Sequence, residues 1–75
     1  MNQIDQLIGR ILDVDPSTLT DSTSHDSVKR WDSIVHLVLI GSLEETFGIE
    51  FTAEEIDRLT TVGAIRTAVN AKRAA

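Results

Sequence analysis

Asp32 and Ser33 are the residues whose types and position most favour covalent chemistry. Asp is a preferred N-cap residue, and the apolar-rich segment that ends at Phe47 predicts a helix directly after it. A hydroxyl at a helix start lies beside unpaired backbone N–H groups and the positive end of the helix dipole, which favour an added phosphate. The pair therefore predicts an exposed serine suited to phosphoryl attachment. A plain N-cap role explains the same two residues and stays open at this point.

A metal site is not predicted. The run Asp13-Val14-Asp15-Pro16-Ser17 begins like a calcium loop, in which alternate oxygens face one ion. The match fails at the sixth and twelfth positions, where Thr18 and Ser24 replace the Gly and Glu that such a loop needs. A plain helix end is the better interpretation of this run.

Catalysis by the chain itself is not expected either. His25 and His36 have no partner that the sequence can show, so both are interpreted as surface histidines. A hydrolase needs serine, histidine and an acid gathered in a cleft, and 75 residues leave little room to enclose a substrate. The chain has no cysteine, which excludes a thiol nucleophile, a thiolate metal site and a disulfide framework.

Four helices are predicted to position the Asp32-Ser33 pair, the first of them starting at Asn2 as N-cap and ending by about Val14. Its apolar stripe predicts a buried face of Ile4, Leu7, Ile8, Ile11 and Leu12. The opposite face, Asp5, Gln6, Gly9 and Arg10, is expected to meet water. Residues 16–31 follow as a long Ser-, Thr- and Asp-rich loop, and loops of this length usually have a function.

The second helix is predicted from Ser33 to Phe47 with Gly48 as its C-terminal cap. Its expected buried face is Leu37, Leu39, Ile40, Leu43 and Phe47, with Leu37 and Phe47 packed across from Ile8 and Ile11.

Two further helices are predicted after it. Thr52 and Glu55 form a capping box that opens a short third helix to about Leu59, which buries Ile56 and Leu59. Thr60 or Thr61 caps a last helix with Val62, Ile65 and Val69 at helical spacing and Arg66, Lys72 and Arg73 towards its C-terminal end. The predicted fold class is therefore an all-α, small four-helix bundle with a long loop between helices one and two.

Composition limits the partners and the compartment. The chain is 41% hydrophobic with a formal charge of −5, so it should fold as one domain with an aliphatic core, and nucleic acid is a poor candidate partner. Neither a signal peptide nor a membrane-spanning run is visible, so a cytoplasmic protein without membrane contact is expected.

Three blocks of sequence resemble the acyl carrier protein family, which includes peptidyl carrier domains, over nearly the whole chain. Trp31-Asp32-Ser33-Ile34 is similar to the Asp-Ser-Leu site of the family. The run from Leu43 to Phe51 is similar to the end of helix two in the family, and Thr60 to Ile65 is similar to its entry into the last helix.

The resemblance implies a single carrier domain over residues 1–75 with the acyl-carrier bundle as its fold. It implies that a phosphopantetheinyl transferase, using Mg²⁺ and coenzyme A, attaches 4′-phosphopantetheine to Ser33, with Asp32 as a carboxylate that faces the metal or the enzyme. The arm would then hold an acyl or aminoacyl group as a thioester. Partners would be a loading enzyme and a downstream synthase or transferase, and the carrier would be a monomer.

Two departures from the family pattern bear on the pathway. Trp31 and Ile34 replace the usual Gly and Leu, and Val35, His36 and Val38 stand where fatty-acid carriers have acidic residues. We therefore expect partners to contact Trp31, Ile34, Val35 and Val38, in a specialised polyketide or nonribosomal peptide type of pathway. Two alternatives stay open, a fatty-acid carrier and a helical interaction domain without a prosthetic group. In that second case Ser33 would be a cap, and Val35 and Val38 would be a docking patch. For the carrier itself, the alternative to a docking surface is that the long loop folds over Val35 and Val38 and buries them.

Overall fold

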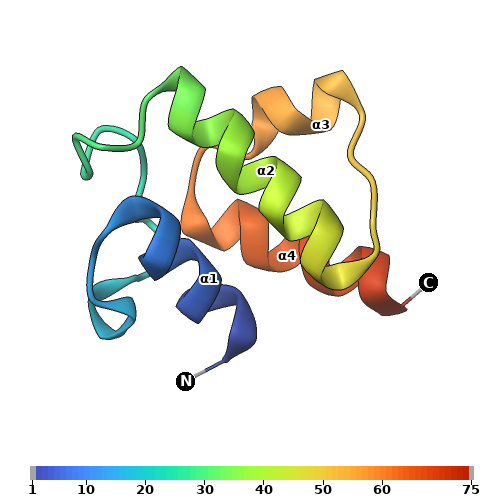
Figure 1. Cartoon of the computed structure of the whole chain (residues 1–75), viewed down its shortest axis with the longest axis horizontal. Coiled ribbons are helices and arrows are strands. Elements are labelled where there is room, and N and C mark those ends of the chain that lie inside the picture. Colours follow the sequence, from blue (N-terminus) through green and yellow to red (C-terminus); the bar gives the residue numbers. More distant parts are fainter. Residues whose placement is uncertain (1, 75) are drawn as a thin grey trace.

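Polar side chains fix where the first two helices begin, as predicted. The computed structural model describes residues 2–74, in which α1 spans Gln3–Leu12 and α2 spans Ser33–Phe47 (Figure 1). Asn2 Oδ1 accepts the Asp5 N–H of α1 at 2.7 Å, and Asp32 Oδ1 accepts the Val35 N–H of α2 at 2.9 Å. Each bond satisfies one of the backbone donors that a helix start leaves unpaired.

The same two helices end in left-handed residues. Asp13 closes α1 at φ 57° and Gly48 closes α2 at φ 65°. Gly adopts this conformation without a Cβ penalty, and Asp tolerates it better than most residues. The predicted ends near Val14 and at Gly48 are confirmed.

The short α3, Ala53–Arg58, and the last helix α4, Val62–Ala74, also start at predicted caps. Thr52 and Glu55 exchange both bonds of a capping box, at 3.1 and 2.8 Å. Thr61 Oγ1 accepts the Ala64 N–H at 3.1 Å, so Thr61 rather than Thr60 caps α4. The described residues thus form the all-helical bundle that the sequence predicts, with a 3₁₀ turn at Pro16–Thr18.

The core lies between α1, α2 and α4, with α3 packed beside the upper end of α2 (Figure 1). Aliphatic side chains fill it, because the chain has only two Phe and one Trp. Its fully buried members are Ile8, Leu12, Leu39, Leu43, Val62, Ile65 and Val69. The predicted burial of Val62, Ile65 and Val69 is confirmed, and Leu59 at the end of α3 is also buried.

The predicted inner face of α2 is wrong at Leu37, whose side chain is 61% exposed. Leu39, Ile40 and Leu43 are buried, and Phe47 is half-buried under the guanidinium of Arg73, which lies 4.9 Å from its ring centre. Because the first turns of α2 are apolar on almost every side, the spacing of apolar residues does not define which side packs inward.

The predicted outer face of α1 is wrong at Asp5 and Gly9, which are both buried. The Arg66 guanidinium reaches Asp5 with two bonds, at 2.9 and 2.7 Å, and also bonds Asp21 of the loop at 2.8 Å. These bonds, the strongest of them from Asp5, raise the pKa of Arg66. Gly9 is covered by the 3₁₀ turn, since a Cβ there would lie 2.8 Å from Pro16 Cγ.

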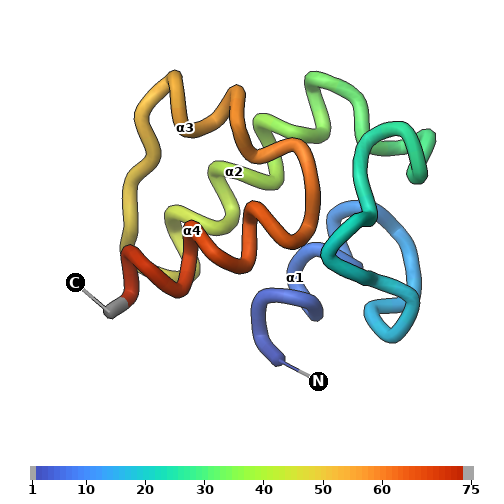
Figure 2. The backbone as a smooth tube through the Cα atoms, turned by 180° about the vertical axis from the view of Figure 1, so that it is seen from behind, coloured from blue at the N-terminus to red at the C-terminus, as the bar shows by residue number. Residues whose placement is uncertain are grey.

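The long loop is fastened to the start of α4 rather than free. The Val62 N–H donates to Thr23 O at 2.8 Å and the Gly63 N–H donates to Asp21 O at 3.0 Å, while Ser24 and Thr61 form an isolated bridge. Figure 2 shows the loop running from α1 to α2 on the side of the bundle where α4 begins. Leu19 and Trp31 anchor it in the core near its two ends.

No helix in residues 2–74 combines the length and the apolar character that crossing a membrane requires.

Truncation of two leucines on opposite sides of α2 tests its orientation. Leu43→Ala removes a fully buried side chain and should lower the free energy of unfolding by about 2 to 5 kcal/mol. Leu37→Ala, the matched control on the exposed side, should change it by about 0.5 kcal/mol or less. Urea unfolding followed by circular dichroism measures both variants. A larger loss for Leu37→Ala would contradict the observed packing.

Removal of the Arg66 charge tests the link between α1, the loop and α4. Arg66→Met keeps most of the side-chain length but leaves the nearly buried Asp5 carboxylate without its partner, which should cost about 1.5 to 3 kcal/mol of unfolding free energy. The control is Arg58→Met, which breaks an exposed pair with Glu54 at 3.8 Å and should cost about 0.5 kcal/mol or less. Equal losses in urea unfolding would show that the Asp5 pair has no special role.

Candidate functional site

Ser33 occupies the exposed start of α2. Because Asp32 supplies the N-cap oxygen, the Ser33 hydroxyl is not needed to close the helix start. No hydrogen bond involves the Ser33 side chain among the residues that the structure describes. The sequence prediction of an accessible hydroxyl at this helix start is therefore consistent with the geometry.

A cleft of about 260 Å³ opens directly beside Ser33. The long loop, the start of α2 and the α3 segment all contribute to it. Its lining residues are His25, Trp31, Asp32, Ser33, His36, Ile56, Asp57, Leu59 and Thr60.

A hydrogen-bonded bridge forms one wall of this cleft. The Trp31 indole Nε1–H donates to His36 Nδ1 at 2.9 Å, and His36 Nε2 lies 2.9 Å from the backbone oxygen of Ile56 in α3. The two rings stack with centres 6.0 Å apart and planes 27° apart. Sequence reasoning missed this bridge, because nothing in a spacing of five residues shows that an indole donor meets an imidazole acceptor.

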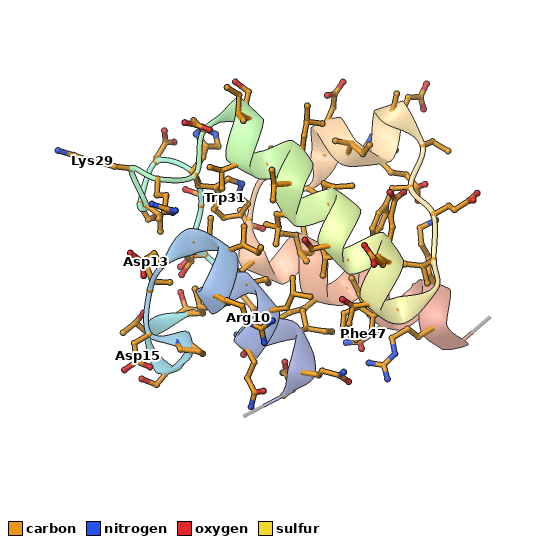
Figure 3. The ribbon with its side chains drawn as sticks, viewed as in Figure 1. Arg10, Asp13, Asp15, Lys29, Trp31 and Phe47 are labelled. Atoms are coloured by element: carbon orange, nitrogen blue, oxygen red, sulfur yellow. The ribbon has the colours of Figure 1, made fainter. Side chains whose placement is uncertain are left out.

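Both residues of the bridge require corrections to the sequence analysis. Trp31, expected as a partner contact, is only 3% exposed and points into the molecule (Figure 3). It is buried because it anchors the end of the loop under α2. His36, interpreted as a surface histidine, is half-buried and bonded at both ring nitrogens. His25 is exposed as expected, and its Nδ1 lies 3.4 Å from a carboxylate oxygen of Asp26.

The exposed side of α2 carries an apolar surface, the α2 patch, made of Ile34, Leu37 and Val38. Their side chains are 75%, 61% and 52% exposed. Ile34 and Val38 were expected in this position, whereas Leu37 was not. Val35 was expected with them, but it is half-buried and packs against the core. The loop does not cover the patch.

Charges surround the site unevenly. The first two turns of α2 carry no charged side chain, while Asp32 and Asp57 line the cleft. On α3, the Glu55 carboxylate accepts the Thr52 N–H and pairs with Lys72 at 3.0 Å, which together hold the pKa of Glu55 below its ordinary value. Lys29 points away from the bundle into solvent (Figure 3).

A metal centre is absent from the described residues, in which no group of three or more His, Asp or Glu side chains converges. Asp15 instead accepts the N–H and hydroxyl of Ser17 at 2.9 and 2.8 Å, and the backbone bond in particular lowers the pKa of Asp15. The carboxylate that suggested a calcium loop therefore caps the 3₁₀ turn.

Comparison with known proteins agrees with this geometry. The family described as "Phosphopantetheine attachment site" matches residues 2–69. An acyl carrier protein of Thermosynechococcus vestitus is 32% identical over the whole chain and 93% of its own length. The solution structure of a holo acyl carrier protein from Geobacter metallireducens superposes with a TM-score of 0.85 at 34% identity, over 99% of this chain and 88% of that one.

The family match covers most of the chain, and the relative matches over nearly its full length. Both are consistent with the helical bundle and with an exposed serine at the start of α2. The chain belongs to the acyl carrier proteins, which bear a covalent 4′-phosphopantetheine group and carry acyl groups for other enzymes without being catalysts themselves.

Proposed function

We propose that Ser33 is the attachment point for 4′-phosphopantetheine. The observation that carries this proposal is that Asp32, and not Ser33, caps α2. The exposed Ser33 hydroxyl is therefore free for attachment. Unpaired N–H groups and the dipole at this helix start favour a phosphodiester on that oxygen. The adjacent cleft of about 260 Å³ offers room for part of the arm beside its attachment point.

Attachment needs a phosphopantetheinyl transferase, because no side chain among the described residues accepts a hydrogen bond from the Ser33 hydroxyl to activate it. In the proposed reaction the Ser33 oxygen displaces the nucleotide portion of coenzyme A from phosphorus and loses its proton to the transferase. Asp32 Oδ1 is occupied by the Val35 N–H, whereas its other oxygen is free among the described residues to face the Mg²⁺ or a cation of the transferase.

The attached group supplies the thiol that this cysteine-free chain lacks, and that thiol carries the acyl or aminoacyl cargo. The contribution of the chain is then to hold the attachment point at a rigid helix start. It also presents the surface that loading and downstream enzymes recognise. We propose that residues 1–75 do this as a monomeric, cytoplasmic carrier domain.

The α2 patch is the proposed docking surface for those enzymes. Ile34 lies next to Ser33, and Leu37 and Val38 follow on the same side of the helix within two turns. No charge interrupts this side until Glu45, so the partner surface should be apolar where it meets the patch. This chemistry favours a specialised polyketide or nonribosomal peptide type of pathway over fatty-acid synthesis, in which carriers meet partners through an acidic helix two.

Loading of Ser33 tests the attachment. Incubation with coenzyme A, Mg²⁺ and a broad-specificity transferase should add one phosphopantetheine mass to the chain, as measured by intact mass spectrometry. Ser33→Ala should abolish the addition while changing the unfolding free energy by about 0.5 kcal/mol or less, because Asp32 still caps α2. Ser27→Ala, an exposed loop serine, is the control and should load normally. Loading that persists in Ser33→Ala would refute the site, and an unloaded wild-type chain would favour an interaction domain.

A charge placed in the α2 patch tests docking. Val38→Asp should leave folding and Ser33 loading largely intact but slow transfer from the loaded carrier to the downstream enzyme by tenfold or more, since about 1.4 kcal/mol of lost apolar contact corresponds to that factor. Thr46→Asp adds the same charge to an exposed position near the end of α2 and serves as control. Transfer in the unmutated carrier should respond weakly to salt. Strong inhibition by moderate salt would favour acidic recognition instead.

A further inference from the structure

The bridge beside Ser33 fixes the proton of His36 on one nitrogen. An indole N–H is a donor only, so His36 Nδ1, 2.9 Å from Trp31 Nε1, must act as the acceptor. The remaining ring proton then lies on Nε2, which donates to the Ile56 carbonyl oxygen at 2.9 Å. The Trp31 half of the bridge therefore exists only while the imidazole is neutral.

This bridge joins α3 to the start of α2. In the part of the chain that the structure describes, the His36 to Ile56 bond is the one side-chain hydrogen bond between residues of α2 and residues of α3. With six residues, α3 is far too short to be stable alone and depends on such tertiary contacts. Its other attachments include the buried Leu59, the Ile56 side chain packed against the core, and the pair of Glu55 with Lys72 of α4. Both residues of the bond to Ile56 line the cleft, so this attachment lies directly at the cleft wall.

We propose that His36 is the positioning residue for this cleft. When neutral it holds α3 against the start of α2, and when protonated it releases α3 and opens the space beside Ser33. The effect on the prosthetic arm and its cargo rests on the proposed attachment at Ser33, whereas the bridge and its opening do not.

Protonation breaks the Trp31 half of the bridge for a geometric reason, and because the imidazole is rigid, a ring that moves away from the indole also carries Nε2 away from the Ile56 oxygen. A cationic imidazole carries an N–H on Nδ1, which would face the Trp31 N–H, so two donors would meet with no acceptor between them. Trp31 is almost fully buried and cannot turn to water without leaving the core, so its N–H would lose its partner. The described structure has no buried side-chain nitrogen or oxygen without a partner, so this bond satisfies the indole completely.

Other ionisable groups line the same cleft, so a pH-dependent opening must be assigned to one of them by experiment. Asp32 at the start of α2, Asp57 of α3 and His25 of the loop line the cleft together with His36. Glu55 also fastens α3, but its lowered pKa keeps it ionised through the range of about pH 5 to 8, in which histidines usually titrate. Opening in that range therefore points to a histidine rather than to the pair of Glu55 and Lys72.

Hydrogen exchange on the full chain without coenzyme A tests the bridge independently of Ser33 loading. At pH 8, His36→Phe should lower the protection factors of the α3 amides by about 2- to 12-fold, the range for loss of one hydrogen bond, and leave those of α1 unchanged. Trp31→Phe, which keeps a ring but removes the indole N–H, should have a similar effect. His36→Gln is the rescue variant, because its amide nitrogen still donates to Ile56 without titrating.

The pH dependence of α3 protection distinguishes a positioning role of His36 from a role in packing alone. In the wild type the α3 protection factors should fall between pH 8 and pH 5, whereas those of His36→Gln should stay constant. Trp31 is the only tryptophan and the chain has no tyrosine, so its fluorescence emission should show the same transition. The transition should disappear in His36→Gln and persist in the control His25→Gln. Unchanged α3 protection in His36→Phe, or a transition that survives in His36→Gln, would overturn the proposal.

Discussion

The hydrogen bond from the Val35 N–H to Asp32 decides where α2 begins, and much of the molecule depends on that position. A helix that began one residue later would place Ser33 in the loop instead of at the start of α2. One short polar contact therefore defines both the start of the main core helix and the place of the exposed hydroxyl on it. The same side chain also faces the cleft, so structural and functional demands meet on a single carboxylate.

Local signals in the sequence were enough to predict the four helices and their boundaries. Asn2, Asp32, Thr52 and Gly48 act within three or four residues of themselves, so their roles can be identified without knowledge of the fold. The Asp32-Ser33 pair belongs to the same class of signal. This explains why the candidate attachment residue and its cap were identified from the sequence, together with the helix that presents them.

Most of the features that the sequence did not reveal depend on residues far apart in the chain. Asp5 was expected in water because its partner Arg66 is 61 positions away, and the His36 to Ile56 bond spans 20 positions. Leu37 was misplaced because α2 offers apolar residues on more sides than the core can accept. Which of them remain outside depends on how α1 and α4 pack, and a surplus of apolar residues at a helix start is itself a sign of an interaction surface.

The long loop has a consequence for how the chain folds. Its carbonyls at Asp21 and Thr23 accept the first N–H groups of α4, about forty residues further on, so the start of that helix is completed by a distant segment rather than by its own neighbours alone. Non-local closures of this kind must be formed against chain entropy and slow the folding of an otherwise local, helical topology. Loop order and the last helix therefore arise together in one cooperative step. Residues 25–30 take no part in these bonds to α4, so insertions should be tolerated there far better than at 21–24, where an added residue would disturb the two carbonyl bonds or the bridge between Ser24 and Thr61.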